Sequence, residues 1–130
     1  MHKNRWWLTA EGPTLDSGAF VAGLEYATGR PAHVLGKPAA AFFKLAADEV
    51  AAEAAASGGA GRPARGEIAM VGDDVWNDAL AAQRIGLRGV LVLSGKHGVA
   101  ELDRAAGQGR GGGRPNAVAA SLAEVVAALA

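Results

Sequence analysis

The sequence predicts an α/β fold, with parallel strands and flanking helices in a partial Rossmann-like arrangement. Two short apolar runs, 67–71 and 89–93, are each followed by a segment with helical spacing. Strands that alternate with helices in this way are typical of β-α-β units and of a parallel sheet. The length of 130 residues, of which 50% are hydrophobic, suits one domain with a buried core.

Composition narrows the classes of function. Thirteen basic residues balance thirteen acidic ones, so we expect no attraction to nucleic acid or to an anionic membrane. No apolar run reaches the roughly 18–20 residues that a membrane-spanning helix needs. The chain has no cysteine, which excludes disulfides and thiolate metal sites. We therefore expect a cytoplasmic protein.

The other elements follow from capping residues and apolar spacing. Asp16 or Ser17 can cap a helix that Gly29 terminates, and Pro38 suits the first position of the next helix. We expect further strands or extended segments at 5–8 and 33–35, and helices up to residue 28 and at 39–56, 76–85 and 99–105. A turn is expected at 11–13, a loop at 57–63 and a glycine-rich segment at 107–113. The last part of the chain, 116–130, should form a strand and a helix.

An acidic motif follows the first apolar strand. Gly72 is followed by Asp73 and Asp74, and Asp78 comes within the next helical turn. In open α/β sheets, ligands bind at the carboxyl ends of the strands, and oxygen ligands of this kind suit Mg²⁺. The alternative is structural, because Asp74 can cap the following helix and acids near a helix N-terminus favour its dipole.

A lysine precedes the second helix, in the sequence Gly36-Lys37-Pro38. A helix N-terminus attracts anions, and a lysine beside it adds a charge that can reach a phosphate. The alternative is a solvated lysine in a turn, which is where most lysines lie.

Together these motifs resemble the C-terminal part of the haloacid dehalogenase superfamily of hydrolases. The resemblance covers about residues 1–105 and rests on the order of Val34 to Pro38, Glu67 to Asp74, Asp78 and then Gly89 to Lys96. It is strongest with the subgroup that has a large α/β cap, the NagD-like and phospholysine phosphohistidine inorganic pyrophosphate phosphatase-like enzymes. It implies that residues 1–29 end the cap and return to the core, and that 30–130 form the C-terminal part of the core.

The resemblance also implies roles for the candidate site residues. Lys37 matches the lysine that steadies the nucleophilic aspartate and the transferring phosphoryl group. Asp73 matches the aspartate that binds Mg²⁺ directly, and Asp78 matches the second acid, which supports the metal. Asp74 is a further candidate metal ligand. The implied substrate is a small phosphorylated molecule, which this chemistry serves through positioning and charge neutralisation.

The family's D-x-D-G motif, whose first aspartate attacks phosphorus, does not occur in these 130 residues. The nearest sequence, from Leu15 to Gly18, has one acid and no apolar strand before it, so we interpret Asp16 as a helix cap. We therefore expect no appreciable phosphatase activity from this chain alone. We also expect strand 67–71 to have an unpaired apolar edge, so that the chain self-associates or needs a complementing N-terminal half.

Two functional hypotheses remain open on the sequence alone. The first is part of a Mg²⁺-dependent phosphatase, and the second is a non-catalytic remnant that binds Mg²⁺ or a partner subunit. The glycine- and arginine-rich segment 109–114 could suggest RNA binding, but it is short and lacks aromatic residues, so we interpret it as a flexible loop.

Overall fold

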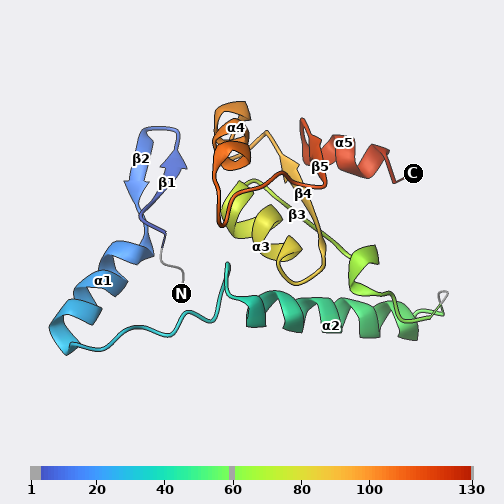
Figure 1. The fold of residues 1–130 in the computed structure, drawn as a ribbon, viewed down its shortest axis with the longest axis horizontal. Helices are drawn as coiled ribbons and strands as arrows, with labels where there is room; N and C mark the ends of the chain where they lie inside the picture. The colour runs from blue at the N-terminus through green and yellow to red at the C-terminus, as the bar shows by residue number, and fades with distance from the viewer. Residues whose placement is uncertain (1–3, 59–60, 130) are drawn as a thin grey trace.

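The computed structural model describes residues 4–58 and 61–129. Within these residues, helices flank a three-stranded sheet, and a separate two-stranded hairpin lies near the N-terminus (Figure 1). Residues 59 and 60 of the expected loop and the last residue of the chain lie outside the described part. Of the helices described, none is both long and apolar enough to cross a membrane.

The parallel sheet that the sequence predicts is confirmed. It consists of β3 (Ala69–Gly72), β4 (Arg88–Val92) and β5 (Ala117–Ala119), in the order β3-β4-β5. Both pairs are parallel, with Val71 opposite Val90 and Leu91 opposite Val118. Among the described strands β3 pairs with β4 alone, so it forms an edge of the sheet, as expected.

The N-terminal segment forms a hairpin and a helix that lie to one side of the sheet (Figure 1). The hairpin pairs β1 (Trp6–Thr9) with β2 (Gly12–Leu15), and α1 (Ser17–Thr28) follows it. The turn expected at 11–13 lies one residue earlier, at Ala10 and Glu11, because Gly12 and Pro13 belong to β2. A proline is tolerated there because a two-stranded ribbon has only edge strands.

The caps of α1 agree with the sequence. The Asp16 carboxylate accepts a hydrogen bond from the Ser17 N–H at 2.6 Å, and Gly29 ends the helix in the left-handed conformation, with a φ of 63°. The interpretation of Asp16 as a helix cap is therefore confirmed.

Helix α2 (Ala40–Ala56) begins later than expected. Its N-cap is Ala39, so Pro38 precedes the helix instead of opening it. Glu67 also differs from the prediction: it lies in a short 3₁₀ turn, η1 (Arg65–Glu67), where its carboxylate accepts the Ala64 N–H at 2.8 Å. That local hydrogen bond competes with strand pairing and delays the start of β3.

The helix expected at 76–85 is divided. A π-helical turn, η2 (Val75–Ala79), leads into the single turn of α3 (Leu80–Gln83). Two more helices follow: α4 (Val99–Gly107) and, after β5, α5 (Leu122–Ala127). π-Helical turns are rare and often occur at functional sites, and this one contains Asp78, the last acid of the motif.

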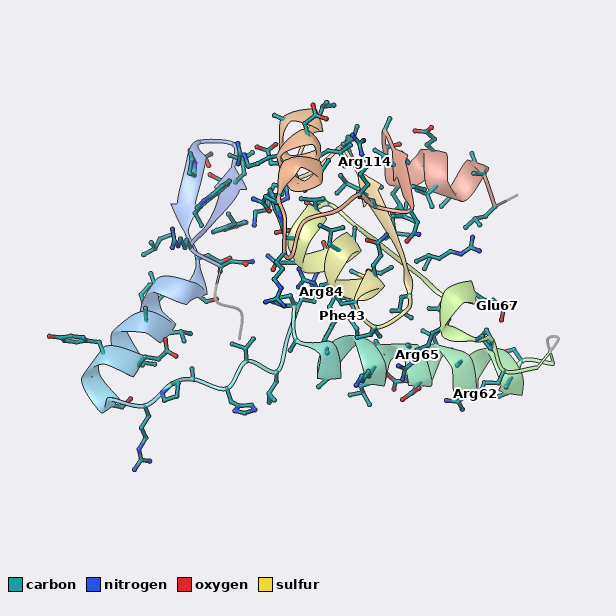
Figure 2. All side chains as sticks on the ribbon, in the orientation of Figure 1. Phe43, Arg62, Arg65, Glu67, Arg84 and Arg114 are labelled. Atoms are coloured by element: carbon teal, nitrogen blue, oxygen red, sulfur yellow. The ribbon has the colours of Figure 1, made fainter. Side chains whose placement is uncertain are left out.

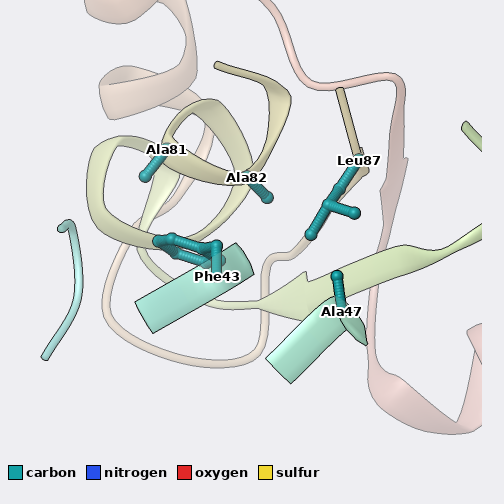
Figure 3. Close-up of a cluster of buried hydrophobic side chains, with 5 residues drawn as sticks. All are labelled: Phe43, Ala47, Ala81, Ala82 and Leu87. Carbon is teal, nitrogen blue, oxygen red and sulfur yellow. The ribbon is translucent and has the colours of Figure 1, made fainter. Parts of the chain in front are cut away.

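The core has two clusters of buried side chains. The first joins α2 to the helix after the acidic motif, with Phe43 and Ala47 packed against Ala81, Ala82 and Leu87 (Figure 3). The second lies between η2, β4 and α4 and contains Val75, Leu80, Leu91 and Ala105. These clusters fix α2, η2 and α4 around the sheet and so fix the positions of the residues at its edge.

The glycine-rich segment lies against α3. The Arg84 guanidinium donates to the Gly111 carbonyl and the Gln83 amide donates to the Arg114 carbonyl, both at 3.2 Å (Figure 2). Gly112 approaches the Ala105 carbonyl so closely that a Cβ would lie 2.4 Å from it. Hydrogen bonds and close packing therefore anchor this segment at several points. The sequence analysis, which interpreted it as a flexible loop, did not predict these contacts.

Candidate functional site

The candidate site lies at the carboxyl edge of the parallel sheet. Asp73 and Asp74 follow directly after β3, and residues 93–97 follow after β4. Because the two strands are parallel neighbours, these two loops meet at the same edge. The acids and the second loop are thus brought together by the sheet.

Lys37 joins this edge from the segment before α2. Its Nζ lies 2.6 Å from Asp78 Oδ1, and the Asp78 side chain is only 3% exposed. The other oxygen of Asp78, Oδ2, accepts the Asp74 N–H at 3.2 Å. The sequence predicts Lys37 beside Asp73, whereas the contact that the structure shows is with Asp78, which folds back onto the loop after β3.

Two glycines make room for the acids. A Cβ on Gly72 would lie 2.3 Å from Asp78 Oδ2, and a Cβ on Gly95 would lie 2.2 Å from Asp73 Oδ2. Real Cβ atoms essentially never approach that closely. Any side chain at either position would therefore displace the carboxylate beside it.

Asp73 is held by the loop after β4. Its Oδ2 accepts the Lys96 N–H at 2.9 Å, and its carbonyl accepts the His97 N–H at 3.1 Å. Its Oδ1 makes no hydrogen bond to the residues that the structure describes. Asp73 is half-buried and lines a cavity of about 420 Å³ beneath the tip of the β1–β2 hairpin. One carboxylate oxygen is therefore fixed, while the other can accept a ligand.

Asp74 is the N-cap of η2. Its Oδ1 accepts the N–H groups of Trp76 and Asn77, at 3.1 and 2.9 Å. Its Oδ2 accepts the Asn77 amide at 3.0 Å and the Lys96 ammonium at 2.9 Å. Burial raises the pKa of Asp74, but these hydrogen bonds and the nearby His97 outweigh it and hold the pKa below the ordinary value. The capping alternative for Asp74 is confirmed.

His97 and Lys96 belong to the candidate site by their contacts with its acids, and the sequence did not single them out. His97 is 7% exposed, and its Nδ1 accepts the Val75 N–H at 3.1 Å. Burial lowers the pKa of His97 below its ordinary value, and the nearby Asp74 opposes this shift. One signal could have found both residues: they follow the second parallel strand, at the edge where the acids follow the first.

A metal site at this edge would be assembled around a single acid. In residues 4–58 and 61–129 there is no group of three acidic or histidine side chains arranged around one point. Mg²⁺ usually takes one or two carboxylates and completes its shell with water and phosphate oxygens. Asp73 lines a cavity and has one oxygen without a hydrogen bond to the described residues, so it fits that pattern. Asp78 follows in the next turn of the chain, η2.

Comparison with protein families gives one match. The model described as HAD-hydrolase-like matches residues 34–125, which include Lys37, Asp73 and Asp78. The match covers more than half of the chain.

Two curated relatives are similar over most of the chain. Haloacid dehalogenase-like hydrolase domain-containing protein 2 of Bos taurus is 38% identical over 104 residues, which are 80% of this chain and 36% of that protein. Phospholysine phosphohistidine inorganic pyrophosphate phosphatase of Bos taurus is 39% identical over 94 residues, which are 72% of this chain and 31% of that protein. The chain thus spans about a third of the length of these relatives.

Solved structures show the same fold. A p-nitrophenyl phosphatase from Archaeoglobus fulgidus superposes with a TM-score of 0.71 at 30% identity, covering 98% of this chain and 44% of that one. A glycerol phosphate phosphatase from Mycobacterium tuberculosis, solved in complex with magnesium, gives a TM-score of 0.65 at 28% identity, covering 95% and 32%.

Proposed function

Because the chain belongs to the HAD-like hydrolase family, we propose that it supplies the lysine and the metal-binding aspartate of a Mg²⁺-dependent phosphatase. The observation that carries this proposal is the contact of Lys37 with Asp78 at 2.6 Å, in the turn that follows Asp73 and Asp74. Lys37 and Asp78, from segments far apart in the chain, are in contact near the edge where parallel sheets bind their ligands, and Asp73 follows directly after β3 at that edge. The phosphatases among the relatives support the class of reaction.

In this proposal Asp73 would hold Mg²⁺, and the Lys96 N–H fixes one oxygen of its carboxylate, Oδ2. Bound Mg²⁺ would polarise the phosphoryl oxygens of the substrate. Asp78 orients Lys37, and the ammonium offsets the negative charge that develops on the phosphoryl group. A metal-ligand role for Asp74 stays a prediction, since its observed partners are those of a helix cap.

The attacking aspartate would come from outside these 130 residues, which contain no D-x-D-G sequence. We propose that it is supplied by a complementing N-terminal half, which would pair with the edge of β3 that no described strand covers. A homo-oligomer is the other proposed assembly, and it would cover that edge without supplying the aspartate. The substrate would be a small phosphorylated molecule. The division into a cap segment, 1–29, and a core segment, 30–130, and the cytoplasmic location stay predictions.

Calorimetric titration with Mg²⁺ tests the metal site directly. We expect saturable binding to the unmodified chain, a loss of at least about tenfold in affinity for Asp73→Ala, and no change for Asp103→Ala. Asp103 is the matched control because it is an exposed acid on α4. Equal binding by all three proteins would contradict the assignment of Asp73.

Activity separates the phosphatase from a remnant that only binds Mg²⁺ or a partner. The chain is co-expressed with the N-terminal half of a related enzyme and assayed with p-nitrophenyl phosphate and Mg²⁺. We expect turnover from the complemented pair, abolished by Asp73→Asn, and none from the chain alone. Mg²⁺ binding without turnover by a stable complemented pair would favour the non-catalytic alternative.

A further inference from the structure

The first four backbone N–H groups at the start of η2, beginning with that of Asp74, all donate to side chains. Such groups have no carbonyl partner within the helical turn that they open, so they need partners from elsewhere. The Asp78 carboxylate accepts the Asp74 N–H at 3.2 Å, and the Asp74 carboxylate accepts the N–H groups of Trp76 and Asn77. The remaining group, the Val75 N–H, donates to a side chain from another loop.

That side chain belongs to His97, which follows β4. Its Nδ1 accepts the Val75 N–H at 3.1 Å, and its backbone N–H donates to the Asp73 carbonyl at 3.1 Å. His97 therefore binds the backbone on both sides of Asp74. Val75 is 0% exposed, so its N–H group depends on an acceptor from within the protein.

The imidazole ring is held in one orientation by Trp76. The two rings meet edge to face, with their centroids 5.1 Å apart, and the Trp76 Nε1–H donates to Gln108 Oε1 at 2.9 Å. The ring of His97 is itself buried. Because a ring nitrogen that accepts a hydrogen bond carries no proton, the imidazole serves Val75 as an acceptor.

The same loop also binds the carboxylate of Asp73. The Lys96 N–H donates to Asp73 Oδ2 at 2.9 Å, so two consecutive backbone N–H groups hold the side chain and the carbonyl of Asp73. The loops after β3 and β4 are thus joined at Asp73 by backbone groups and at Val75 by the imidazole. Outer partners of this kind orient metal ligands, and their loss typically lowers metal affinity about 10- to 100-fold.

We propose that His97 is a positioning residue for Asp73: by accepting the Val75 N–H, its imidazole keeps the loop after β3 against the loop after β4. This inference rests on the proposed Mg²⁺ site. The alternative role is packing, in which the flat ring only fills the space beside Trp76. Two substitutions distinguish these roles, because asparagine keeps an acceptor without the ring and phenylalanine keeps a ring without the acceptor.

Calorimetric titration of the whole chain with Mg²⁺ compares these variants. We expect His97→Asn to bind Mg²⁺ about as tightly as the unmodified chain, and His97→Phe and His97→Ala to bind it about tenfold more weakly. His97→Ala keeps the test valid if the phenylalanine ring does not fit, because its side chain is smaller than that of histidine. His33→Phe, at an exposed histidine, is the matched control and should leave the affinity unchanged.

Amide hydrogen exchange, followed by nuclear magnetic resonance in Mg²⁺-free buffer, tests the contact itself. The Val75 amide should exchange slowly in the unmodified chain and in His97→Asn. It should exchange at least about tenfold faster in His97→Phe and His97→Ala, which offer it no acceptor.

The outcomes separate this inference from the metal site on which it rests. Loss of Mg²⁺ affinity and of Val75 protection in His97→Asn, with both kept in His97→Phe, would assign the ring to packing and overturn the inference. Weaker binding by Asp73→Ala, with unchanged binding by His97→Phe and His97→Ala, overturns it too but leaves the phosphatase proposal standing. Unchanged binding by Asp73→Ala overturns both.

Discussion

At the carboxyl edge of the sheet, Lys37 and Asp78 lie 41 residues apart in the chain and 2.6 Å apart in space. In α1, by contrast, Phe20 and Leu24 are 66% and 64% exposed, and Val21 is the one buried residue. The polar side chains at the edge are buried or half-buried and bonded to distant segments, whereas most of the large apolar side chains of α1 are exposed.

This difference shows which region carries its own stability. The edge rests on the two core clusters and on hydrogen bonds between separate loops, so the described chain explains its geometry. Helix α1 has good caps but little buried apolar surface, and helix stability in proteins comes mostly from packing of an apolar face. We infer that α1 reaches full stability only when a further polypeptide surface covers it.

The largest expected effect on stability comes from comparing two phenylalanine substitutions, one in the core and one in α1. Phe43 in the core is 2% exposed, so Phe43→Ala should lower the free energy of unfolding by about 3–5 kcal/mol. Phe20→Ala in α1 should change it by less than about 0.5 kcal/mol. The measurement for both variants is urea denaturation followed by circular dichroism. Similar losses from the two variants would show that the chain buries α1 on itself, for example by self-association.

A smaller effect is expected from a single methyl group at the edge. Gly95→Ala should cost about 1–3 kcal/mol, because the new Cβ would overlap the Asp73 carboxylate. It should also weaken Mg²⁺ binding, because Asp73 would move. Gly109→Ala is the control, since a Cβ there meets nothing within 4 Å. If denaturation and Mg²⁺ calorimetry do not distinguish the two variants, the loop after β4 does not position Asp73.

The smallest effect concerns pH. Burial is the main reason why the pKa of His97 is lowered from 6.5 in the folded chain, with Asp74 opposing and Lys96 adding to the shift. The unfolded chain therefore takes up the proton first, and stability should fall as the pH drops from 7 toward 5. His97→Asn keeps an acceptor for the Val75 N–H but cannot titrate. Thermal melts across this range should show a flatter dependence for His97→Asn, and an unchanged slope would remove His97 as the cause.

Much of the fold could be predicted because its signals are local. The apolar runs that form β3 and β4, the Asp16 cap and the Gly29 terminator each act within a few residues, and each prediction was confirmed. The second strand of the hairpin was missed because Gly12 and Pro13 usually mark a turn, and only pairing with β1 makes them a strand. The start of α2 was placed too early for a similar reason, since proline preference is only statistical.

By itself the sequence determined the α/β class, the family and the identity of the acids and the lysine, because these depend on residue type, order and spacing. Only the tertiary structure decided which of them touch. In the structure Lys37 contacts Asp78, and the two oxygens of Asp74 accept hydrogen bonds from the helix N-terminus and from Lys96. The loop from Gly95 to His97 lies against Asp73. Those contacts join segments that are distant along the chain, and their geometry follows from the pairing of β3 with β4 and from the space that two glycines leave.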